Sequence, residues 1–379
     1  MKVLFVAKSF VRGGAATGAR NLLLSLYSED VEVVKVSLDD LPSNSLKITR
    51  LAERSLEHLI FGSNYHSLRF GPASVKLLDI AEKVKPDIIQ LGDFSGNLID
   101  FKSLSDMNLK IVHRLSDFWP YTGPTHYELQ NQRYKYQMAN FLFNYFYKRQ
   151  DLKNVNLVMP SEWLRKELNK SLDEFKHCGM RSVILNAVEN AKFKKNLSED
   201  DGITVGFIAK NINSFRKGLK QLLRLLKDDC FSELNLKLCL YGDGYFEGVN
   251  MDNNVSIAHY GRYSEEQKHN VYSNIDILLI PSLQDNSPNV VSEAMSFGVP
   301  CIGQESTGME SYISIKNGRL FDFWSEHADA RELKSKILEI KKCYNSFSDE
   351  CKDFTDSQLS YSSIGKQYYD LYRYLTSTR

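Results

Sequence analysis

The sequence predicts an α/β protein with two doubly wound, Rossmann-like domains. Short apolar segments of strand type alternate with helical patterns, and the alternation restarts after a polar, lysine-rich stretch at 186–201. A chain of 379 residues is also too long for one ordinary hydrophobic core. Strands that alternate with helices are typical of parallel sheets covered on both faces. We therefore expect two domains that face one cleft.

Apolar runs place the strands of the first series. These expected strands are 3–7, 31–36, 86–91, 109–113, 157–160 and 183–185. Leucines at helical spacing predict a helix over 15–27. Ser161 and Glu162 have the pattern of a helix start, and that helix is expected to end near Leu172.

The second series follows the polar stretch. Its expected strands are 203–208, 236–241, 275–281 and 300–303, and its expected helices are 218–226 and 290–297. A last helix is predicted over 361–375, because Ile364, Tyr368 and Leu371 recur at helical spacing.

Composition excludes several classes of protein. The net charge of +1 gives no field that would attract nucleic acid, and no apolar run approaches the length that spans a bilayer. The six cysteines show neither metal-ligand spacing nor a disulfide framework, so we expect reduced thiols in a cytoplasmic protein. The first residues, MKVLFVAKSF, contain too short an apolar run for a signal peptide and read as a first strand.

Two acids after an expected strand form the first candidate site. Asp285 lies in the loop that follows 275–281, and Glu293 lies in the helix expected over 290–297. Open α/β sheets bind ligands outside the carboxyl ends of their strands, so both carboxylates can face one crevice. Two fixed carboxylates there suit a ligand rich in hydroxyl groups. Alternatively, Asp285 starts the helix, where acids are favoured, and Glu293 lies on a solvated face.

A basic loop after the first strand of the second series is the second candidate. Lys210 and Asn211 begin this loop, and Arg216 and Lys217 precede Gly218 at the start of a helix. A cation at the carboxyl end of a strand can pair with a diphosphate. The alternative is a solvated basic loop.

A glycine-rich loop directly follows the first strand of the chain. Gly13 and Gly14 lie at the start of the expected helix, where small residues let backbone N–H groups approach a phosphate. The spacing differs from the dinucleotide fingerprint. The alternative is a tight turn that needs a residue with positive φ.

A third cluster, at 113–127, follows a strand of the first series and should line the cleft from that side. Its candidate residues are His113, Asp117, Trp119 and His126. A lone histidine is more often structural than functional, so each histidine keeps both interpretations.

A segment at 133–149 is dense in aromatic and basic residues. An amphipathic helix of this composition can lie on an anionic membrane surface. The alternative is a buried helix with a basic end.

In combination, these motifs resemble family 4 glycosyltransferases. The segment 285–303 is similar to their donor-sugar motif, in which two acids frame Ala-Met and Gly-x-Pro elements, although the first acid here is Asp rather than Glu. Lys217-Gly218 is similar to their Lys-Gly element, whereas Lys210 or Asn211 stands where an Arg is usual.

The cluster at 113–127 resembles the colanic-acid-type branch of this family, with Thr125 where many relatives have Cys. The resemblance spans nearly the whole chain and implies the GT-B fold. It places an acceptor-side domain at 1–187, a nucleotide-sugar donor domain at 188–357, and at 358–379 a helix that crosses back to the first domain.

The resemblance also implies roles for the candidate residues. Glu293 would hold the ribose hydroxyls, Asp285 would face the donor sugar, and Lys217 would stabilise the leaving diphosphate. The loop and helix start that would face the sugar and phosphates are Asn286, Ser287, Pro288, Asn289 and Val290. In one alignment, His113 is the family's histidine and would touch the sugar. In the other, Asp117 matches the acid that follows this histidine, and Ser116 then occupies the position of the histidine.

The predicted function is transfer of a hexose, with retention and without a metal ion, from a UDP- or GDP-linked donor. The acceptor would be a saccharide or lipid-linked saccharide in the synthesis of a bacterial exopolysaccharide, O-antigen of lipopolysaccharide, or capsule. No cofactor beyond the donor is expected, and the enzyme would work in the cytoplasm, with peripheral contact at the inner face of the plasma membrane. The alternatives are a nucleotide-sugar epimerase on the same fold and a non-catalytic sugar-binding protein.

Overall fold

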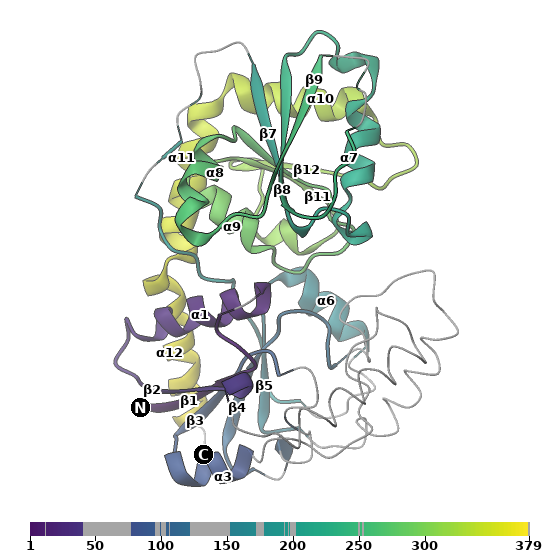
Figure 1. Cartoon of the computed structure of the whole chain (residues 1–379). Helices are drawn as coiled ribbons and strands as arrows, with labels where there is room; N and C mark the ends of the chain where they lie inside the picture. Colours follow the sequence, from purple (N-terminus) through teal and green to yellow (C-terminus); the bar gives the residue numbers. More distant parts are fainter. Residues whose placement is uncertain are drawn as a thin grey trace, which may run out of the picture. The chain divides into compact units, whose positions relative to one another are not determined.

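The computed structural model of the chain describes residues 1–11, 13–40, 77–94, 99, 104–105, 107–121, 152–171, 178–192, 194–195, 197, 202–248, 251 and 254–377. The chain divides into two compact units, Met1–Ala187 with Tyr361–Arg379, and Val188–Ser360. Each unit contains one parallel sheet with helices packed on it (Figure 1). The predicted α/β class is therefore confirmed.

The first unit contains a six-stranded sheet with the order β2-β1-β3-β4-β5-β6. Its strands are β1 (Lys2–Ala7), β2 (Glu32–Ser37), β3 (Ile88–Leu91), β4 (Lys110–Arg114), β5 (Val155–Met159) and β6 (Arg181–Val183). Its described helices include α1 (Gly14–Leu26), α3 (Leu77–Val84), α6 (Glu162–Ser171) and α12 (Tyr361–Ser377). The strand order reverses between β1 and β3, so the loops after these strands diverge at the carboxyl edge of the sheet.

The last helix, α12, packs along α1 in the first unit (Figure 1). Gly365 makes this close approach feasible, because a Cβ atom there would lie 2.3 Å from the carbonyl oxygen of Ser25. Tyr372 is fully buried, and its hydroxyl donates a 2.6 Å hydrogen bond to Gln90 Oε1 in β3. The chain end thus completes the core of the unit in which the chain begins.

The second unit contains a six-stranded sheet with the order β12-β11-β10-β7-β8-β9. Its strands are β7 (Ile203–Asn211), β8 (Leu236–Asp243), β9 (Val255–Gly261), β10 (Ile277–Ile280), β11 (Cys301–Gln304) and β12 (Gly318–Phe321). Its α-helices are α7 (Leu219–Leu226), α8 (Lys268–Ser273), α9 (Asn289–Ser296), α10 (Ala330–Lys342) and α11 (Tyr344–Phe354). The strand order reverses between β10 and β7.

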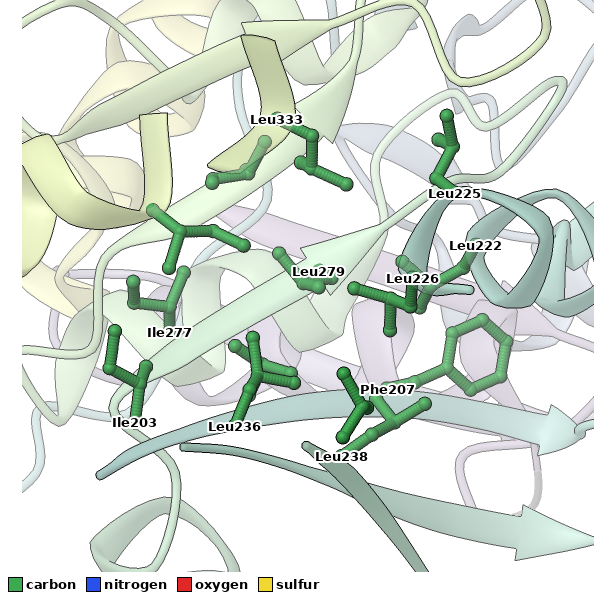
Figure 2. Close-up of a cluster of buried hydrophobic side chains, with 14 of the residues drawn as sticks. Ile203, Phe207, Leu222, Leu225, Leu226, Leu236, Leu238, Ile277, Leu279 and Leu333 are labelled. Atoms are coloured by element: carbon green, nitrogen blue, oxygen red, sulfur yellow. The ribbon is translucent and has the colours of Figure 1, made fainter. Parts of the chain in front are cut away.

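The core of the second unit is a continuous layer of aliphatic side chains with one aromatic ring among those labelled in Figure 2. Leu222, Leu226 and Leu333 from the helices α7 and α10 lie on Phe207 and Leu279 of the sheet (Figure 2). Burial of each such side chain contributes about 1.5–3 kcal/mol. The central strands are therefore held firmly, and their carboxyl ends give fixed starting points for the loops.

The edge strands β9 and β12 and the helices α3, α8, α10 and α11 were not predicted from the sequence. β9 is buried only at Val255, and β12 contains Gly318 and the partly buried Arg319, so neither strand has the continuous apolar run that marks a central strand. In the described part of the chain, no helix has both the length and the apolar character needed to cross a membrane.

The contact between α1 and α12 gives a first prediction. Gly365→Ala should lower the free energy of unfolding by about 1–3 kcal/mol, because the new methyl group overpacks the backbone of Ser25. Lys366→Ala is the matched control, since Lys366 is exposed on the same helix and such substitutions change stability by about 0.5 kcal/mol or less. Urea denaturation measures both, and equal stability of the two variants would contradict the packing.

Candidate functional site

The loops after β7 and β10 lie at the carboxyl edge of the second sheet, at the point where the strand order reverses. This is the position at which doubly wound sheets bind ligands. The loop after β7 ends in the 3₁₀ turn η3 (Phe215–Lys217), and the loop after β10 leads into α9. Both sequence-predicted motifs of this unit therefore start at one place on the sheet.

Gly218 joins these two loops. It has a φ of 77°, which favours glycine, and a Cβ atom there would lie 2.1 Å from the carbonyl oxygen of Pro281. Next to it, the backbone N–H of Leu283 donates a 2.8 Å hydrogen bond to the carbonyl oxygen of Arg216. The close approach brings the side chains of Arg216 and Lys217 to the loop that carries Asp285.

Asp285 is the shared partner of two cations. Lys217 Nζ lies 2.5 Å from Asp285 Oδ2, and Arg216 Nη1 lies 3.4 Å from the same oxygen. Arg216 Nη1 also donates a 2.5 Å hydrogen bond to the carbonyl oxygen of Gln284. Two positive charges and one negative charge leave this cluster with an excess positive charge, which suits an anionic ligand.

The electrostatics of the cluster keep Asp285 ionised. Burial opposes the negative charge, but Lys217 and Arg216 outweigh it and hold the pKa of this carboxyl below its usual range. Burial also lowers the pKa of the Lys217 ammonium, and Asp285 acts in the opposite direction. The carboxylate therefore serves as the counter-charge that lets two cations remain partly buried.

Two polar atoms beside this cluster lack a hydrogen-bond partner among the described residues. They are Ser282 Oγ and Gln284 Oε1, and both belong to the loop after β10. Buried polar groups are usually satisfied by protein, water or ligand. These atoms therefore give the loop additional capacity to bind a polar ligand.

The segment after Asp285 is fixed by its backbone. The N–H of Gly308 donates a 2.9 Å hydrogen bond to the carbonyl oxygen of Asp285, and a Cβ atom on Gly308 would lie 1.6 Å from the carbonyl oxygen of Asn286. Asn286 is buried, and the hydroxyls of Ser287 and Tyr312 lie 2.6 Å apart. The loop is thus held on both sides before α9 begins.

The N-terminus of α9 follows this loop. Pro288 precedes the helix in an extended conformation and supplies no side-chain cap, while Asn289 and Val290 form the first turn. Backbone N–H groups at a helix N-terminus, together with the helix dipole, favour an anion. The predicted residues from Asn286 to Val290 therefore present backbone groups rather than charged side chains.

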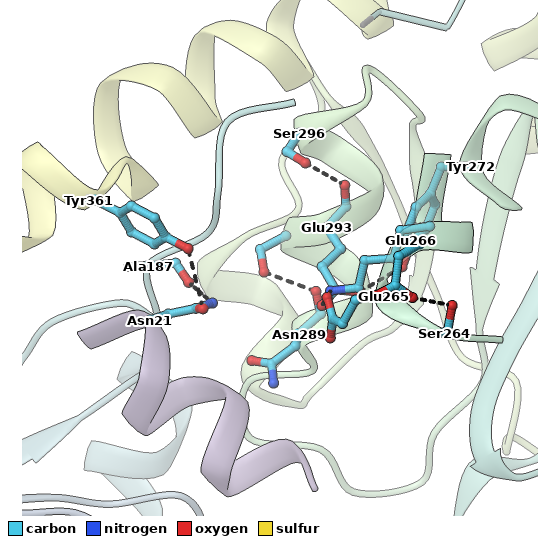
Figure 3. A network of polar contacts seen from close by, with 12 residues as sticks. Asn21, Ala187, Ser264, Glu265, Glu266, Tyr272, Asn289, Glu293, Ser296 and Tyr361 are labelled. Carbon is cyan, nitrogen blue, oxygen red and sulfur yellow. Dashed lines mark hydrogen bonds and ion pairs between the residues drawn. The ribbon is translucent and has the colours of Figure 1, made fainter. Parts of the chain in front are cut away.

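Glu293 lies farther along α9 and is held by α8 (Figure 3). Lys268 Nζ donates a 2.8 Å hydrogen bond to Glu293 Oε1, and the hydroxyl of Tyr272 donates a 3.0 Å hydrogen bond to Oε2. Lys268 is also 2.7 Å from Glu265 Oε2. Glu293 is 9 % exposed, so the solvated face considered from the sequence is not what the structure shows.

Lys210 and Asn211 are exposed at the end of β7. Asn211 Oδ1 accepts a 2.8 Å hydrogen bond from the N–H of Asn213, and Asn213 in turn is hydrogen-bonded to the backbone of Tyr245. Asn211 thus helps to fix the loop that leads to Lys217.

In the first unit, the glycine-rich loop follows β1. Gly13 has a φ of 99° and precedes α1, whose first residue is Gly14. The N–H of Thr17 donates a 2.9 Å hydrogen bond to the carbonyl oxygen of Gly13. The turn therefore requires glycine at position 13 for its conformation, and a role toward phosphate stays a prediction.

His113 lies near the carboxyl end of β4 and is 2 % exposed. Its Nδ1 is 2.9 Å from the hydroxyl of Tyr121, and its ring packs against Phe94 at 4.8 Å. Burial lowers the pKa of His113 from 6.5 to about 3, although Asp93 acts in the opposite direction. The imidazole is therefore neutral at neutral pH, and its contact with a sugar stays a prediction.

Asp117 and Trp119 belong to the same segment. Asp117 Oδ1 accepts a 3.0 Å hydrogen bond from the backbone N–H of Trp119, whose ring packs edge-on against Phe94 at 5.2 Å. His126 and the aromatic-basic segment 133–149 lie outside the described residues.

The structure thus brings Lys217 and Asp285 together and places Glu293 on the helix that follows Asp285. The sequence analysis placed Arg216 in the basic loop but gave a role only to its neighbour Lys217. It did not single out Lys268 or Tyr272, which precede the Asp285 motif and carry no local pattern. Among the described residues, no group of three His, Cys, Asp or Glu side chains is arranged to hold a metal ion.

Comparisons with known proteins place this architecture in the GT-B class. The structure is similar to sucrose-phosphate synthase from Thermosynechococcus elongatus, with a TM-score of 0.65, 14 % identity and coverage of 100 % of both chains. It is similar to Anabaena HepE in complex with UDP and glucose, with a TM-score of 0.60, 17 % identity and coverage of 99 % of this chain and 100 % of that one. At such identities the similarity shows the GT-B fold, which the sequence predicted.

A third similar structure is the lipopolysaccharide outer core galactosyltransferase WaaB in its apo form, with a TM-score of 0.60, 15 % identity and coverage of 98 % of both chains. Residues 202–342 match the family model described as glycosyl transferases group 1. A search of curated proteins finds no match. The family match lies within the second unit, and there it agrees with the predicted class of enzyme, a glycosyltransferase.

Gly218 gives a second prediction. Gly218→Ala should destabilise the protein by about 1–3 kcal/mol more than Gly261→Ala, because its methyl group meets the carbonyl of Pro281. Gly261 has a similar φ of 72°, and the structure shows no described atom within 4 Å of its Cβ position, so this control isolates the backbone strain. Chemical denaturation measures the difference, and equal losses would show that the close approach to Pro281 contributes nothing.

His113 gives a third prediction, on pH. The unfolded histidine binds a proton below pH 6.5, whereas the folded one does so only near pH 3. Stability should therefore fall as pH drops from 6.5 toward 3, by up to about 1.4 kcal/mol per pH unit from this group. In His113→Asn this contribution should vanish, as urea denaturation at several pH values would reveal. An unchanged pH dependence in the variant would mean that His113 does not titrate in this way.

Proposed function

We propose that this protein transfers a hexose from a nucleotide-sugar donor to a saccharide or lipid-linked saccharide acceptor. The observation that carries the proposal is the cluster in which Lys217 and Arg216 share Asp285 at the carboxyl edge of the second sheet. A nucleotide sugar releases a diphosphate, and fixed cations stabilise the charge that develops on it. The excess positive charge of the cluster matches that need.

Other groups of the second unit fit the rest of the donor. The N-terminus of α9 favours the phosphates, and the buried carboxylate of Glu293 can accept hydrogen bonds from ribose hydroxyls. The structure of one similar protein was solved in complex with UDP and glucose. Another similar protein is a lipopolysaccharide outer core galactosyltransferase. These names support a UDP-linked hexose and a role in a bacterial surface polysaccharide, and a GDP-linked hexose is the other donor that we propose to test.

The proposed reaction proceeds with retention and without a metal ion. Lys217 and backbone N–H groups would stabilise the leaving diphosphate, and a donor phosphate oxygen would take the acceptor's proton on the same face. Asp285 would act close to the sugar and also hold both cations in place. In the first unit, His113, Asp117, Trp119 and His126 are the proposed acceptor-side residues.

Two other functions remain as alternatives in the proposal. A nucleotide-sugar epimerase would need acid and base groups beside the sugar, and a non-catalytic protein would bind the nucleotide without turnover. Incubation with a panel of UDP- and GDP-hexoses in excess EDTA, with saccharide acceptors, tests all three. Release of nucleoside diphosphate with formation of a retained glycoside supports the proposal, whereas an epimerised donor or binding without turnover contradicts it.

Lys217 gives a fourth prediction. Lys217→Ala should lower kcat/KM roughly 30- to 1,000-fold, because one charged donor to the diphosphate is lost. This factor corresponds to a loss of about 2–4 kcal/mol of transition-state stabilisation. Lys220→Ala is the matched control, since Lys220 is exposed and lies three residues farther along the chain. Steady-state kinetics on folded protein measures both. Similar kcat/KM values for the two variants would exclude Lys217 from the reaction.

A further inference from the structure

Glu293 is a buried carboxylate whose two oxygens each have one partner within the unit. Lys268 Nζ donates a 2.8 Å hydrogen bond to Oε1. The hydroxyl of Tyr272 donates a 3.0 Å hydrogen bond to Oε2, and Figure 3 shows Tyr272 beside Glu293. A buried carboxylate is costly unless it is paired and hydrogen-bonded. Glu293 also lies past the first turn of α9, so the helix dipole does not account for its position.

Both partners are themselves fixed by their surroundings. Tyr272 is fully buried, and its ring stacks on Phe297 with centroids 5.1 Å apart. Lys268 opens α8, directly after a 3₁₀ turn that is stabilised at its start by a 2.8 Å hydrogen bond from Ser264 N to Gln267 Oε1. The Lys268 ammonium also contacts Glu265, so it is held between two carboxylates. The orientation of the Glu293 carboxylate is thereby set from two sides.

A carboxylate has about four acceptor positions, two on each oxygen. Lys268 uses one position on Oε1 and Tyr272 uses one on Oε2, so each oxygen retains acceptor capacity on a group that is already oriented. Two neighbouring acceptors match two neighbouring hydroxyl donors. A vicinal diol can therefore bind Glu293 without the carboxylate having to turn, which lowers the entropic cost of binding.

We propose that Lys268 and Tyr272 are positioning residues that orient Glu293 to accept both hydroxyls of the donor ribose. This inference rests on the proposed function and deepens it, because it names the residues through which a ribonucleotide is distinguished from a deoxyribonucleotide. Lys268 supplies the counter-charge that keeps Glu293 a strong acceptor, and Tyr272 fixes its second oxygen. Neither side chain needs to touch the nucleotide itself.

The test is a comparison of UDP with 2′-deoxy-UDP, and of GDP with 2′-deoxy-GDP, by calorimetry on the full chain. The wild-type protein should prefer the ribonucleotide by roughly tenfold or more, the effect of a hydrogen bond to a charged group. Lys268→Met keeps the aliphatic stem and Tyr272→Phe keeps the ring on Phe297. In each variant, this preference should fall severalfold, because affinity for the ribonucleotide falls more than affinity for the deoxynucleotide, which keeps only its 3′-hydroxyl for Glu293.

Matched variants separate positioning from general damage to the fold. Lys268→Arg retains the charge and should restore most of the preference, whereas Glu293→Gln should abolish it. Glu265→Gln takes away only the exposed partner of Lys268 and should leave the preference as in the wild-type protein. Thermal unfolding of every variant identifies any variant that fails to fold. If either Lys268→Met or Tyr272→Phe fails to fold, the nucleotide preference of the other variant tests the inference.

The outcomes distinguish this inference from the proposed function. If the wild-type protein binds neither UDP nor GDP, the proposed function fails and the inference fails with it. If the wild-type protein prefers the ribonucleotide and Glu293→Gln abolishes the preference, the nucleotide site stands. Full preference in both Lys268→Met and Tyr272→Phe, or tighter ribonucleotide binding in Lys268→Met, would then overturn the inference alone.

Discussion

The approach of Gly218 to the carbonyl of Pro281 is the contact on which the site in the second unit depends. It holds the end of the loop after β7 against the loop after β10, and the hydrogen bond from Leu283 to Arg216 continues the same contact. Only with these backbones together can two cations share one carboxylate. A side chain at position 218 would push the two loops apart. The glycine at this position therefore determines where Arg216 and Lys217 lie relative to Asp285.

The two acids of the segment after β10 have different surroundings, although eight residues separate them. Asp285 is neutralised by cations from the loop after β7, and Glu293 by a cation from α8. Each acid is therefore fixed by a different part of the unit. Asp285 is held where the strand order of the sheet reverses, and Glu293 is held by α8, which packs beside α9. In the proposed function, one short stretch of sequence would contact two ends of an extended ligand.

The sequence predicted those features that depend only on residues close together in the chain. Central strands such as β1 and β10 are continuous apolar runs, and the Lys217-Gly218 and Asp285 motifs lie in the loops that follow β7 and β10. The edge strands β9 and β12 were missed because partial burial removes the apolar run. The contacts of Lys268 and Tyr272 depend on how α8 packs against α9, and the burial of His113 depends on Phe94 and Tyr121. No short-range pattern encodes such packing.

The path of the chain has a consequence for modularity. The second unit begins at Val188 and ends at Ser360, and the N–H of Val188 donates a 2.9 Å hydrogen bond to the carbonyl oxygen of Leu359. Within the first unit, Asn21 is hydrogen-bonded to both Ala187 and Tyr361, the residues that flank the departure and the return (Figure 3). The second unit is therefore an insertion whose two ends meet, the arrangement in which domains are readily excised or transplanted. The second unit could therefore be exchanged as a whole without disturbing the core of the first unit, into which it is inserted.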